Sequence, residues 1–539
     1  MSLNLFAAMK NLWLLLLLLL SQENFLLSQN SLGELPAKRP NILIAISDDQ
    51  SFAHTSFAGC SFVQTPAFDQ IAREGIYFHN AFVSSPGCAP SRSSILTGRY
   101  PWQNEEAGGH QTLFSKKVKV LPDLLEESGY FVGYTGKGCS PFNWRGSGRS
   151  RNPAGNPFNQ IRYQPDSLPY QGISSINYSQ NFEQFLDEKE DEVPFYFWYG
   201  ASEPHRPFQA GIGLDSGKKL ESVEVPAFLP DATEVREDLL DYAVEIEWFD
   251  YHLEKMIQTL KEAGEYENTL IIVTSDNGMA FPAAKANGYE YGIHVPLAMS
   301  WPAVIKAGRK VEELVSLVAI CPTLLEVAGI QAPTMPSFSA NSLLPVLRGT
   351  DSENAKERNP VVFASRERHS SARWSNLGYP MRIMRTASYL FIWNVYPERW
   401  PAGAPQMLNP DDPLQLRPLY GLGENGENLE QAFFDIDACP TKDFLIEQYK
   451  DSSIFPFFQL AMGKRPEIEL YQIDEDPYCL NNLASEPQVA ETKEALSQQL
   501  RQFLRETEDP RITGPNPDVF ENYQRFAPLR PFPKPDWLK

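Results

Sequence analysis

Cysteine is scarce in this chain and forms no metal-binding pattern. Only six cysteines occur among 539 residues, and no two of them are spaced as C-x-x-C. A structural zinc site or a disulfide framework needs several closely spaced cysteines, so neither is indicated. One disulfide between two of these cysteines remains possible, because the N-terminal segment predicts that the chain is exported. The six are Cys60, Cys88, Cys139, Cys321, Cys439 and Cys479.

An excess of positive charge is also missing. Lysine and arginine total 47 against 68 aspartates and glutamates, which gives a net charge of -21. A nucleic-acid-binding surface is usually basic, so we expect no nucleic-acid partner. A local group of cations or a metal ion can still hold a small anionic substrate against this overall field.

Long hydrophobic runs are absent apart from one at the N-terminus. Lys10 precedes an unbroken leucine run, Leu14 to Leu20, which is too short to span a bilayer and fits the apolar region of a secretory signal. We predict a signal peptide over residues 1–29 and an exported mature chain without a transmembrane segment. Its location would be periplasmic or secreted, or lysosomal in a eukaryote. A short anchor or a buried helix is the alternative.

The remaining composition is that of a large globular protein. Hydrophobic residues make up 42% of the chain and aromatic residues 12%, which is enough for a sizeable core. Continuous apolar runs predict buried strands at residues 41–47, 194–200 and 269–275. Helical patterns cover residues 65–75 and 239–264. This alternation predicts an α/β fold.

The pattern of apolar and polar residues changes after about residue 360. Short strand-like pieces such as "YLFIWNV" are separated by acidic and proline-rich loops. We therefore predict a catalytic domain over 38–360 and a smaller C-terminal subdomain with a tail over 361–539. The proline-rich end, "APLRPFPKPDWLK", is expected to be extended against the surface or free.

Two of the predicted buried strands end in oxygen-bearing side chains. Asp48 and Asp49 follow the first, and Asp276 and Asn277 follow the strand at 269–275. In parallel sheets, ligands bind beyond the carboxyl ends of the strands, and such oxygens suit calcium or magnesium. Either pair alone is also typical of an ordinary turn.

The stretch "SSPGCAPSRSSILTGR", residues 84–99, places Cys88 at the start of a predicted helix with Gly98 just after its end. The N-terminus of a helix favours negative charge, and Arg92 follows one turn later. The residues alone leave Cys88 open as a small buried side chain, a thiol nucleophile, half of a disulfide, or a precursor of another group.

The whole string resembles the signature of the sulfatase family. That signature reads Cys-x-Pro-Ser-Arg, three residues, then Leu-Thr-Gly-Arg, and the chain matches it from Cys88 to Arg99. The resemblance implies that a separate maturation enzyme converts Cys88 to Cα-formylglycine. In its hydrated form, one hydroxyl attacks sulfur and the other later expels sulfate by re-forming the aldehyde.

The resemblance also implies roles for further residues. The metal ligands would be Asp48, Asp49, Asp276 and Asn277 together with the modified Cys88, and the ion would be Ca²⁺, with Mg²⁺ as the alternative. Arg92 would steady the formylglycine, and Lys137 would contact it and the sulfate. His205 would bind sulfate or protonate the leaving atom, and Lys285 would lie beside the sulfate.

One position departs from the family pattern. Many sulfatases have Gly-Lys-x-His, in which the histidine takes the proton of the diol, whereas this chain has Gly136-Lys137-Gly138-Cys139. His110 and His54 are possible substitutes, although we interpret each rather as a structural residue or a substrate contact.

The overall layout is most similar to the heparan N-sulfatases. Weaker motifs such as "GGHQT", "TSDNGMAFP" and "GYPMR" carry this likeness. It implies a sulfated oligosaccharide substrate, with N-sulfoglucosamine first and an O-sulfated algal polysaccharide as the alternative. His110, His369, Arg373 and Arg382 would bind the sugar. The implied fold is an alkaline-phosphatase-like sandwich with a large, mostly parallel sheet and a smaller C-terminal antiparallel sheet.

Two other classes of function are considered. A phosphatase or phosphodiesterase on the same scaffold would use Ser or Thr and two metal ions, but only seven histidines are present and none forms the necessary cluster. A non-catalytic glycan-binding relative would keep Cys88 unmodified or be inactivated by Cys139.

Overall fold

The computed structural model describes residues 38–538 except 333, 334, 336, 351–360, 410, 413 and 422–431. The predicted signal peptide, residues 1–29, lies outside the described residues. The strands are β1 (Asn41–Ser47), β2 (Ile76–Phe82), β3 (Phe131–Gly136), β4 (Asn156–Pro157), β5 (Phe195–Gly200), β6 (Thr269–Ser275), β7 (His294–Val295), β8 (Leu297–Ser300), β9 (Arg309–Ser316), β10 (Val361–Arg366), β11 (Met381–Thr386), β12 (Tyr389–Asn394) and β13 (Ile468–Gln472).

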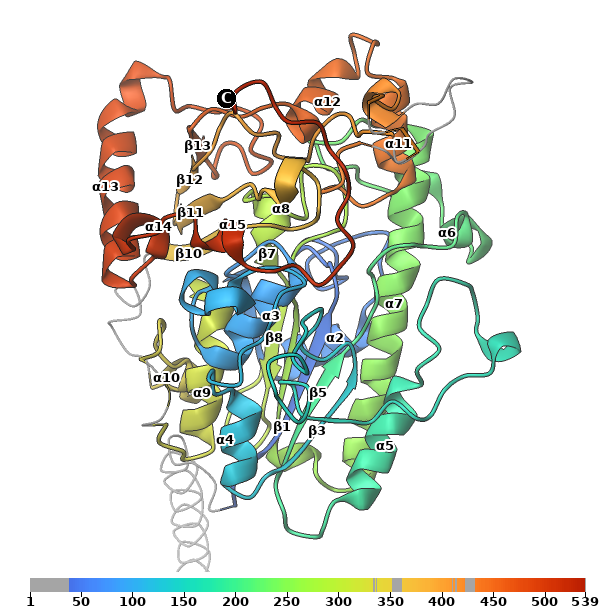
Figure 1. Ribbon diagram of the computed structural model, residues 1–539. Helices are drawn as coiled ribbons and strands as arrows, with labels where there is room; N and C mark the ends of the chain where they lie inside the picture. Colours follow the sequence, from blue (N-terminus) through green and yellow to red (C-terminus); the bar gives the residue numbers. More distant parts are fainter. Residues whose placement is uncertain are drawn as a thin grey trace, which may run out of the picture.

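The α-helices are distributed along the whole described chain (Figure 1). They are α2 (Pro66–Glu74), α3 (Cys88–Thr97), α4 (Leu121–Glu127), α5 (Tyr178–Glu188), α6 (Ile212–Asp215), α7 (Thr233–Glu262), α8 (Glu290–Ile293), α9 (Ile320–Val327), α10 (Leu344–Arg348), α11 (Pro440–Glu447), α12 (Phe455–Met462), α13 (Ala490–Glu506), α14 (Pro510–Thr513) and α15 (Val519–Asn522). In the described part of the chain, no helix is long and apolar enough to cross a membrane.

A nine-stranded mixed sheet forms the centre of the larger part. Its order is β4-β3-β5-β1-β6-β8-β2-β7, with β9 also paired to β2. The half that contains β4, β3, β5, β1 and β6 is parallel throughout. The α/β prediction, with a large and mostly parallel sheet, is therefore confirmed.

Strand β1 has a continuously apolar sequence because both of its faces are buried. All seven of its residues are buried, and its side chains alternate between two separate apolar clusters. Ile42, Ile44 and Ile46 belong to one cluster, whereas Leu43 and Ala45 belong to the other. Both faces of the sheet are thus covered, which parallel strands joined by helices require.

The helices cover the two faces in different groups. Figure 1 shows α5 and the long α7 on one side, and α3, α4 and α9 on the other. The helix predicted over 239–264 corresponds to α7, which begins earlier, at Thr233, and ends two residues sooner, at Glu262. Side chains of α2 and α7 pack together in the second cluster, among them Phe68, Phe249 and Leu253.

A second sheet follows β10. Strands β10, β11, β12 and β13 pair in that order and are all antiparallel, as expected for the smaller C-terminal sheet. Helix α13 covers one face through Leu496, Leu500 and Leu504. On the other face, Ile383 and Ile392 join the cluster of the large sheet. The two sheets therefore share a core.

The proline-rich tail is ordered against the rest of the protein. The Phe526 amide donates to the carbonyl oxygen of Gln111 at 2.8 Å, and the Arg530 amide donates to Ser371 Oγ at 3.0 Å. Phe532 is buried. Of the two expectations for the tail, extended packing on the surface is the one found.

Candidate active site

Strands β1 and β6 bring four oxygen-bearing side chains together. They are adjacent and parallel, with Ser47 opposite Ser275, so the residues that follow them meet at one edge of the sheet. The Asp49 amide donates to Asp276 Oδ1 at 3.1 Å, and Asn277 Nδ2 donates to Asp49 Oδ1 at 2.7 Å. This is the convergence that the two strand ends predicted.

Asp49 has a strained backbone at this edge. Its φ is 78°, a left-handed conformation that non-glycine residues rarely adopt. The hydrogen bonds to Asp276 and Asn277 hold it there. Strain of this kind is found at functional sites, where the surrounding contacts fix it.

Helix α3 presents Cys88 to the same edge. The helix begins at Cys88 and all ten of its residues are buried. It ends at Gly98, which has a left-handed φ of 67°, and a Cβ at that position would lie 2.6 Å from the Phe338 ring. The family signature therefore contains both ends of this helix, and glycine is required at the second.

Cys88 is close to two of the carboxylates. Ligand atoms of Asp48, Cys88 and Asp276 all lie within 4.8 Å of one another, and all three residues are buried. Burial raises the pKa of the Cys88 thiol to about 11. The structure thus places the residue proposed as precursor directly beside two proposed metal ligands.

Three cations neutralise the carboxylates. Arg92 Nε donates to Asp276 Oδ2 at 2.6 Å, Lys285 Nζ donates to Asp49 Oδ2 at 2.6 Å, and Lys137 Nζ pairs with Asp48 Oδ2. Each contact uses only one carboxylate oxygen. All three cations lie at the site where the sequence placed them.

The donor set fits a divalent metal ion. Asp48 Oδ1 and Asn277 Oδ1 are buried and have no hydrogen-bond partner among the described residues, although buried oxygens normally have one. Carboxylate and amide oxygens are the ligands that Ca²⁺ prefers. The ion would be held by these two oxygens together with carboxylate oxygens of Asp49 and Asp276.

Asp437 is a site residue that the sequence did not reveal. It lies 152 positions after Lys285, yet its Oδ2 accepts a hydrogen bond from Lys285 Nζ at 2.8 Å. Asp49, His205 and Asp437 also have ligand atoms within 4.8 Å of one another. Burial opposes ionisation, but the Lys285 ammonium holds the pKa of Asp437 well below its usual range. The local string "FDIDAC" contains no motif that could have predicted this.

A cavity of about 510 Å³ opens onto this edge. Polar groups from several loops converge on it, as expected of a ligand site. Its lining residues are Asp48, Cys88, His110, Gln111, Lys137, Ser140, Pro141, Gly172, Ser174, Ser202, His205 and Arg206. We call it the catalytic cavity.

His205 has a fixed orientation in the catalytic cavity. Its Nδ1 lies 2.7 Å from the carbonyl oxygen of Arg206; since a carbonyl can only accept, Nδ1 carries a proton. Its Nε2 lies 3.9 Å from Asp49 Oδ2. Nε2 is therefore the nitrogen that faces the cluster of charged groups.

His110 and Cys139 differ in their relation to Cys88. His110 Nε2 lies 3.4 Å from Cys88 Sγ, and burial together with the nearby His369 places the pKa of His110 well below its usual range. Cys139 is fully buried and does not line the catalytic cavity. His54 is buried against the rings of Tyr242 and Phe62. His110 is the candidate substitute that the structure brings to Cys88.

The proposed sugar-binding residues divide into two groups. His369 is near the cavity: its ring centroid is 5.2 Å from that of His110. Arg373 is buried and pairs with Asp435 at 2.6 Å. Arg382 is fully buried and pairs with Glu367 and Asp509. Neither arginine lines the catalytic cavity, and both are paired with buried carboxylates after residue 360.

Comparison with protein families agrees with the signature at Cys88. The family model described as Sulfatase matches residues 40–330, which is more than half of the chain. The chain belongs to the sulfatase family. It is therefore a hydrolase of sulfate esters or sulfamates, as the signature at Cys88 predicted.

Curated relatives of this sulfatase act on glycans. N-sulphoglucosamine sulphohydrolase of Homo sapiens is 28% identical over 515 residues, covering 90% of this chain and 94% of the relative. An ulvan-active sulfatase of Formosa agariphila is 25% identical over 472 residues, covering 87% and 80%.

Solved structures share the fold of this sulfatase. BT4656 in complex with D-glucosamine-2-N,6-O-disulfate aligns with a TM-score of 0.59 at 19% identity, covering 88% of this chain and 99% of that chain. Phosphonate monoester hydrolase of Agrobacterium radiobacter aligns with a TM-score of 0.57 at 16% identity, covering 87% and 96%. The alkaline-phosphatase-like architecture is confirmed.

Proposed function

We propose that this sulfatase removes a terminal sulfate from a sulfated glycan through a Cα-formylglycine at position 88, with N-sulfoglucosamine as the preferred sugar. The observation that supports it most is the position of Cys88. This residue lies at the start of α3, within 4.8 Å of the proposed metal ligands Asp48 and Asp276, on a cavity that also contains Lys137 and His205. The hydrated formylglycine would supply an oxygen nucleophile for sulfur and release sulfate by re-forming the aldehyde.

The cations of the site would bind the sulfate. Lys137 and Lys285 keep Asp48 and Asp49 charge-balanced, and both present ammonium groups that can also donate to sulfate oxygens. Arg92 is fully buried between Asp276 and the carbonyl oxygen of Gly138. It would therefore hold Asp276 and the start of α3 in place.

His205 would protonate the leaving atom. Its Nδ1 proton is committed to the carbonyl oxygen of Arg206, so only Nε2 can exchange a proton with a ligand in the cavity. Protonated Nε2 can donate to the glucosamine nitrogen, or to a sugar oxygen, as the bond to sulfur breaks.

His110 would take over the task of the histidine that Cys139 replaces. We expect His110→Ala to lower kcat about 10²- to 10⁴-fold, because a positioned base contributes a factor of that size. The desulfated sugar should still appear in one rapid equivalent, since only the release of sulfate needs this base. Rapid-quench measurement of both products checks this. His79→Gln, at a half-buried histidine outside the cavity, is the control. If the variant lost the rapid first equivalent of desulfated sugar as well as steady-state turnover, this role of His110 would be contradicted.

The acidic cluster would hold Ca²⁺, which when bound would add positive charge beside the sulfate. We expect purified protein to contain one equivalent of calcium and to melt at a higher temperature when calcium is added, because a ligand at 100 times its Kd stabilises by about 2.7 kcal/mol. Asp48→Asn should lose both effects, whereas Asp187→Asn, at an exposed position of α5, should keep them. Metal analysis measures the bound calcium, and thermal melts measure the change in melting temperature. Wild-type protein that contains no metal and whose melting temperature does not change with calcium would disprove the site.

The choice of sugar is tested by sulfate release from two oligosaccharide sets. One set ends in N-sulfoglucosamine and the other in O-sulfated algal sugars. The first is favoured by 28% identity over nearly the full length of N-sulphoglucosamine sulphohydrolase. The second is kept because the ulvan-active relative is 25% identical and because Cys139 departs from the usual pattern. Release from the second set alone would replace our first choice by the second.

A further inference from the structure

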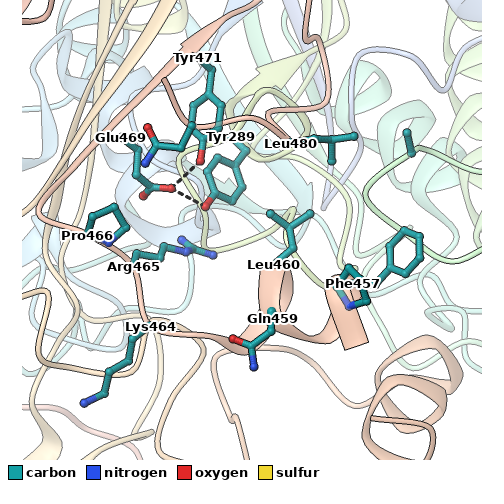
Figure 2. A pocket seen from close by; sticks show the side chains of 13 residues that line it. Tyr289, Phe457, Gln459, Leu460, Lys464, Arg465, Pro466, Glu469, Tyr471 and Leu480 are labelled. Carbon is teal, nitrogen blue, oxygen red and sulfur yellow. Dashed lines mark hydrogen bonds between the residues drawn. The ribbon is translucent and has the colours of Figure 1, made fainter. Parts of the chain in front are cut away.

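A second cavity, of about 550 Å³, lies between α12, β13 and the loop that precedes α8 (Figure 2). It shares no lining residue with the catalytic cavity. We call it the α12–β13 pocket. Its lining residues are Ala227, Tyr289, Pro456, Phe457, Gln459, Leu460, Lys464, Arg465, Pro466, Glu469, Tyr471, Leu480 and Asn482.

Arg465 is a buried cation that forms no ion pair with any residue that the structure describes. It is 7% exposed, and among the described residues no carboxylate oxygen lies within 4.0 Å of its guanidinium. Nη2 donates to Asn287 Oδ1 at 2.8 Å, but Nε and Nη1 are buried and find no hydrogen-bond partner within the described part of the chain. Buried charges are normally paired, so a pocket-lining guanidinium with free donors indicates an anion supplied from outside.

Glu469 lines the same pocket but is not that anion. Its Oε2 accepts hydrogen bonds from the hydroxyls of Tyr289 at 2.8 Å and Tyr471 at 2.7 Å, and its Oε1 accepts from Asn394 Nδ2 at 2.7 Å. Figure 2 shows the two tyrosine bonds beside Arg465. Both oxygens of the Glu469 carboxylate therefore already accept hydrogen bonds from other donors, and these bonds fix its orientation.

The remaining lining residues suit a sugar ring. The Arg465 guanidinium lies 4.7 Å from the centre of the Tyr289 ring, so an anion at Arg465 would sit next to an aromatic surface. Phe457 and Leu460 add apolar area, and the exposed Lys464 and Gln459 place an ammonium and an amide among the lining groups. Aromatic surface with a few polar groups is typical of small-ligand sites.

We propose that the α12–β13 pocket is a second, non-catalytic glycan site that binds a sulfated sugar unit through Arg465 and Lys464. The choice of a sulfated sugar rests on the proposed function. Guanidinium groups bind sulfate oxygens through charge-assisted hydrogen bonds, and the two free donors of Arg465 provide them. The site would hold a further part of a long substrate, or a second chain, without taking part in the chemistry.

The test measures the binding of a sulfated disaccharide to Cys88→Ala protein by calorimetry. This variant cannot turn the ligand over, so catalysis is not required. We expect two equivalents to bind to Cys88→Ala, and one equivalent after the further change Arg465→Gln. Lys464→Glu, at an exposed position, should weaken the second site about tenfold or more without affecting folding, since it replaces attraction by repulsion. Arg505→Gln, an exposed arginine of α13, is the matched control and should leave two equivalents.

Three results would overturn the proposal. Stoichiometry that stays the same in both Arg465→Gln and Lys464→Glu would show that the pocket binds no sulfated sugar. Equal affinity for inorganic sulfate and for the disaccharide would show that the sugar ring is not recognised. Equal affinity for the desulfated disaccharide would show that Arg465 needs no anion. Because binding is measured without turnover, a failure of the proposed catalytic function would show separately, in the sulfate-release assay.

Discussion

Cys88→Ala should release sulfate at least about 10³-fold more slowly than the wild-type protein after maturation, because the substitution removes the proposed nucleophile entirely. The side chain is buried and small, and alanine fits the first turn of α3, so the variant should fold. Sulfate release from matured protein, together with a mass spectrum of the peptide that contains residue 88, checks both parts. The wild-type peptide should have lost the mass expected for conversion of the thiol to an aldehyde.

The matched control for this substitution is Cys60→Ala. Cys60 is only partly buried and lies outside the catalytic cavity, so its removal should leave activity unchanged. Full activity in Cys88→Ala would show that formylglycine is not the nucleophile. An intact thiol in wild-type protein, after co-expression with a maturation enzyme, would instead favour the non-catalytic glycan-binding alternative.

Arg382→Ala should lower the free energy of unfolding by about 3–5 kcal/mol, which is the usual result of leaving a buried charge without its partner. Arg382 is fully buried and bridges Asp509 and Glu367, and Glu367 also pairs with Arg511. Removing the guanidinium leaves the buried Asp509 carboxylate without its ion-pair partner. Because typical proteins are stable by about 5–15 kcal/mol, this loss is large. Urea unfolding followed by circular dichroism measures it.

The control for Arg382→Ala is Arg505→Ala, which should change stability by no more than about 0.5 kcal/mol because the residue is exposed. The same pair of variants separates a structural role from sugar binding. Folded Arg382→Ala protein, assayed at low temperature, should keep the wild-type KM. Unchanged stability with a raised KM would instead support the sugar-binding role that the sequence predicted for Arg382.

A phosphatase or phosphodiesterase is the other catalytic alternative on this scaffold. The structural likeness to phosphonate monoester hydrolase shows only the shared fold. The family match over residues 40–330 favours sulfate chemistry. The described residues that cluster with metal-ligand spacing near Cys88 are mainly carboxylates, whereas a pair of zinc ions prefers histidine ligands in addition.

The sequence predicted the centre of the site because its signals are local. A continuously apolar run such as residues 41–47 needs cover on both faces, which in an α/β pattern means a parallel strand. The side chains that follow such strands must then meet at one edge. Cys88, Arg92 and Gly98 occur within eleven residues of one signature, and a single helix, α3, fixes their relative positions.

Only the tertiary structure decided the contacts between distant segments. Asp437 reaches Lys285 across 152 positions of sequence, and Arg382 reaches Asp509 across 127. Their local sequences look like ordinary charged loops or strands. An arginine in a motif can bind a ligand or a buried carboxylate equally well. Only the packing shows that Arg382 is paired inside the protein and that Arg465 forms no ion pair with the residues that the structure describes. The sequence by itself determined the family, the α/β fold and the nucleophile candidate, because these depend on short patterns. Which charges face a ligand depended on how the second sheet packs against the first.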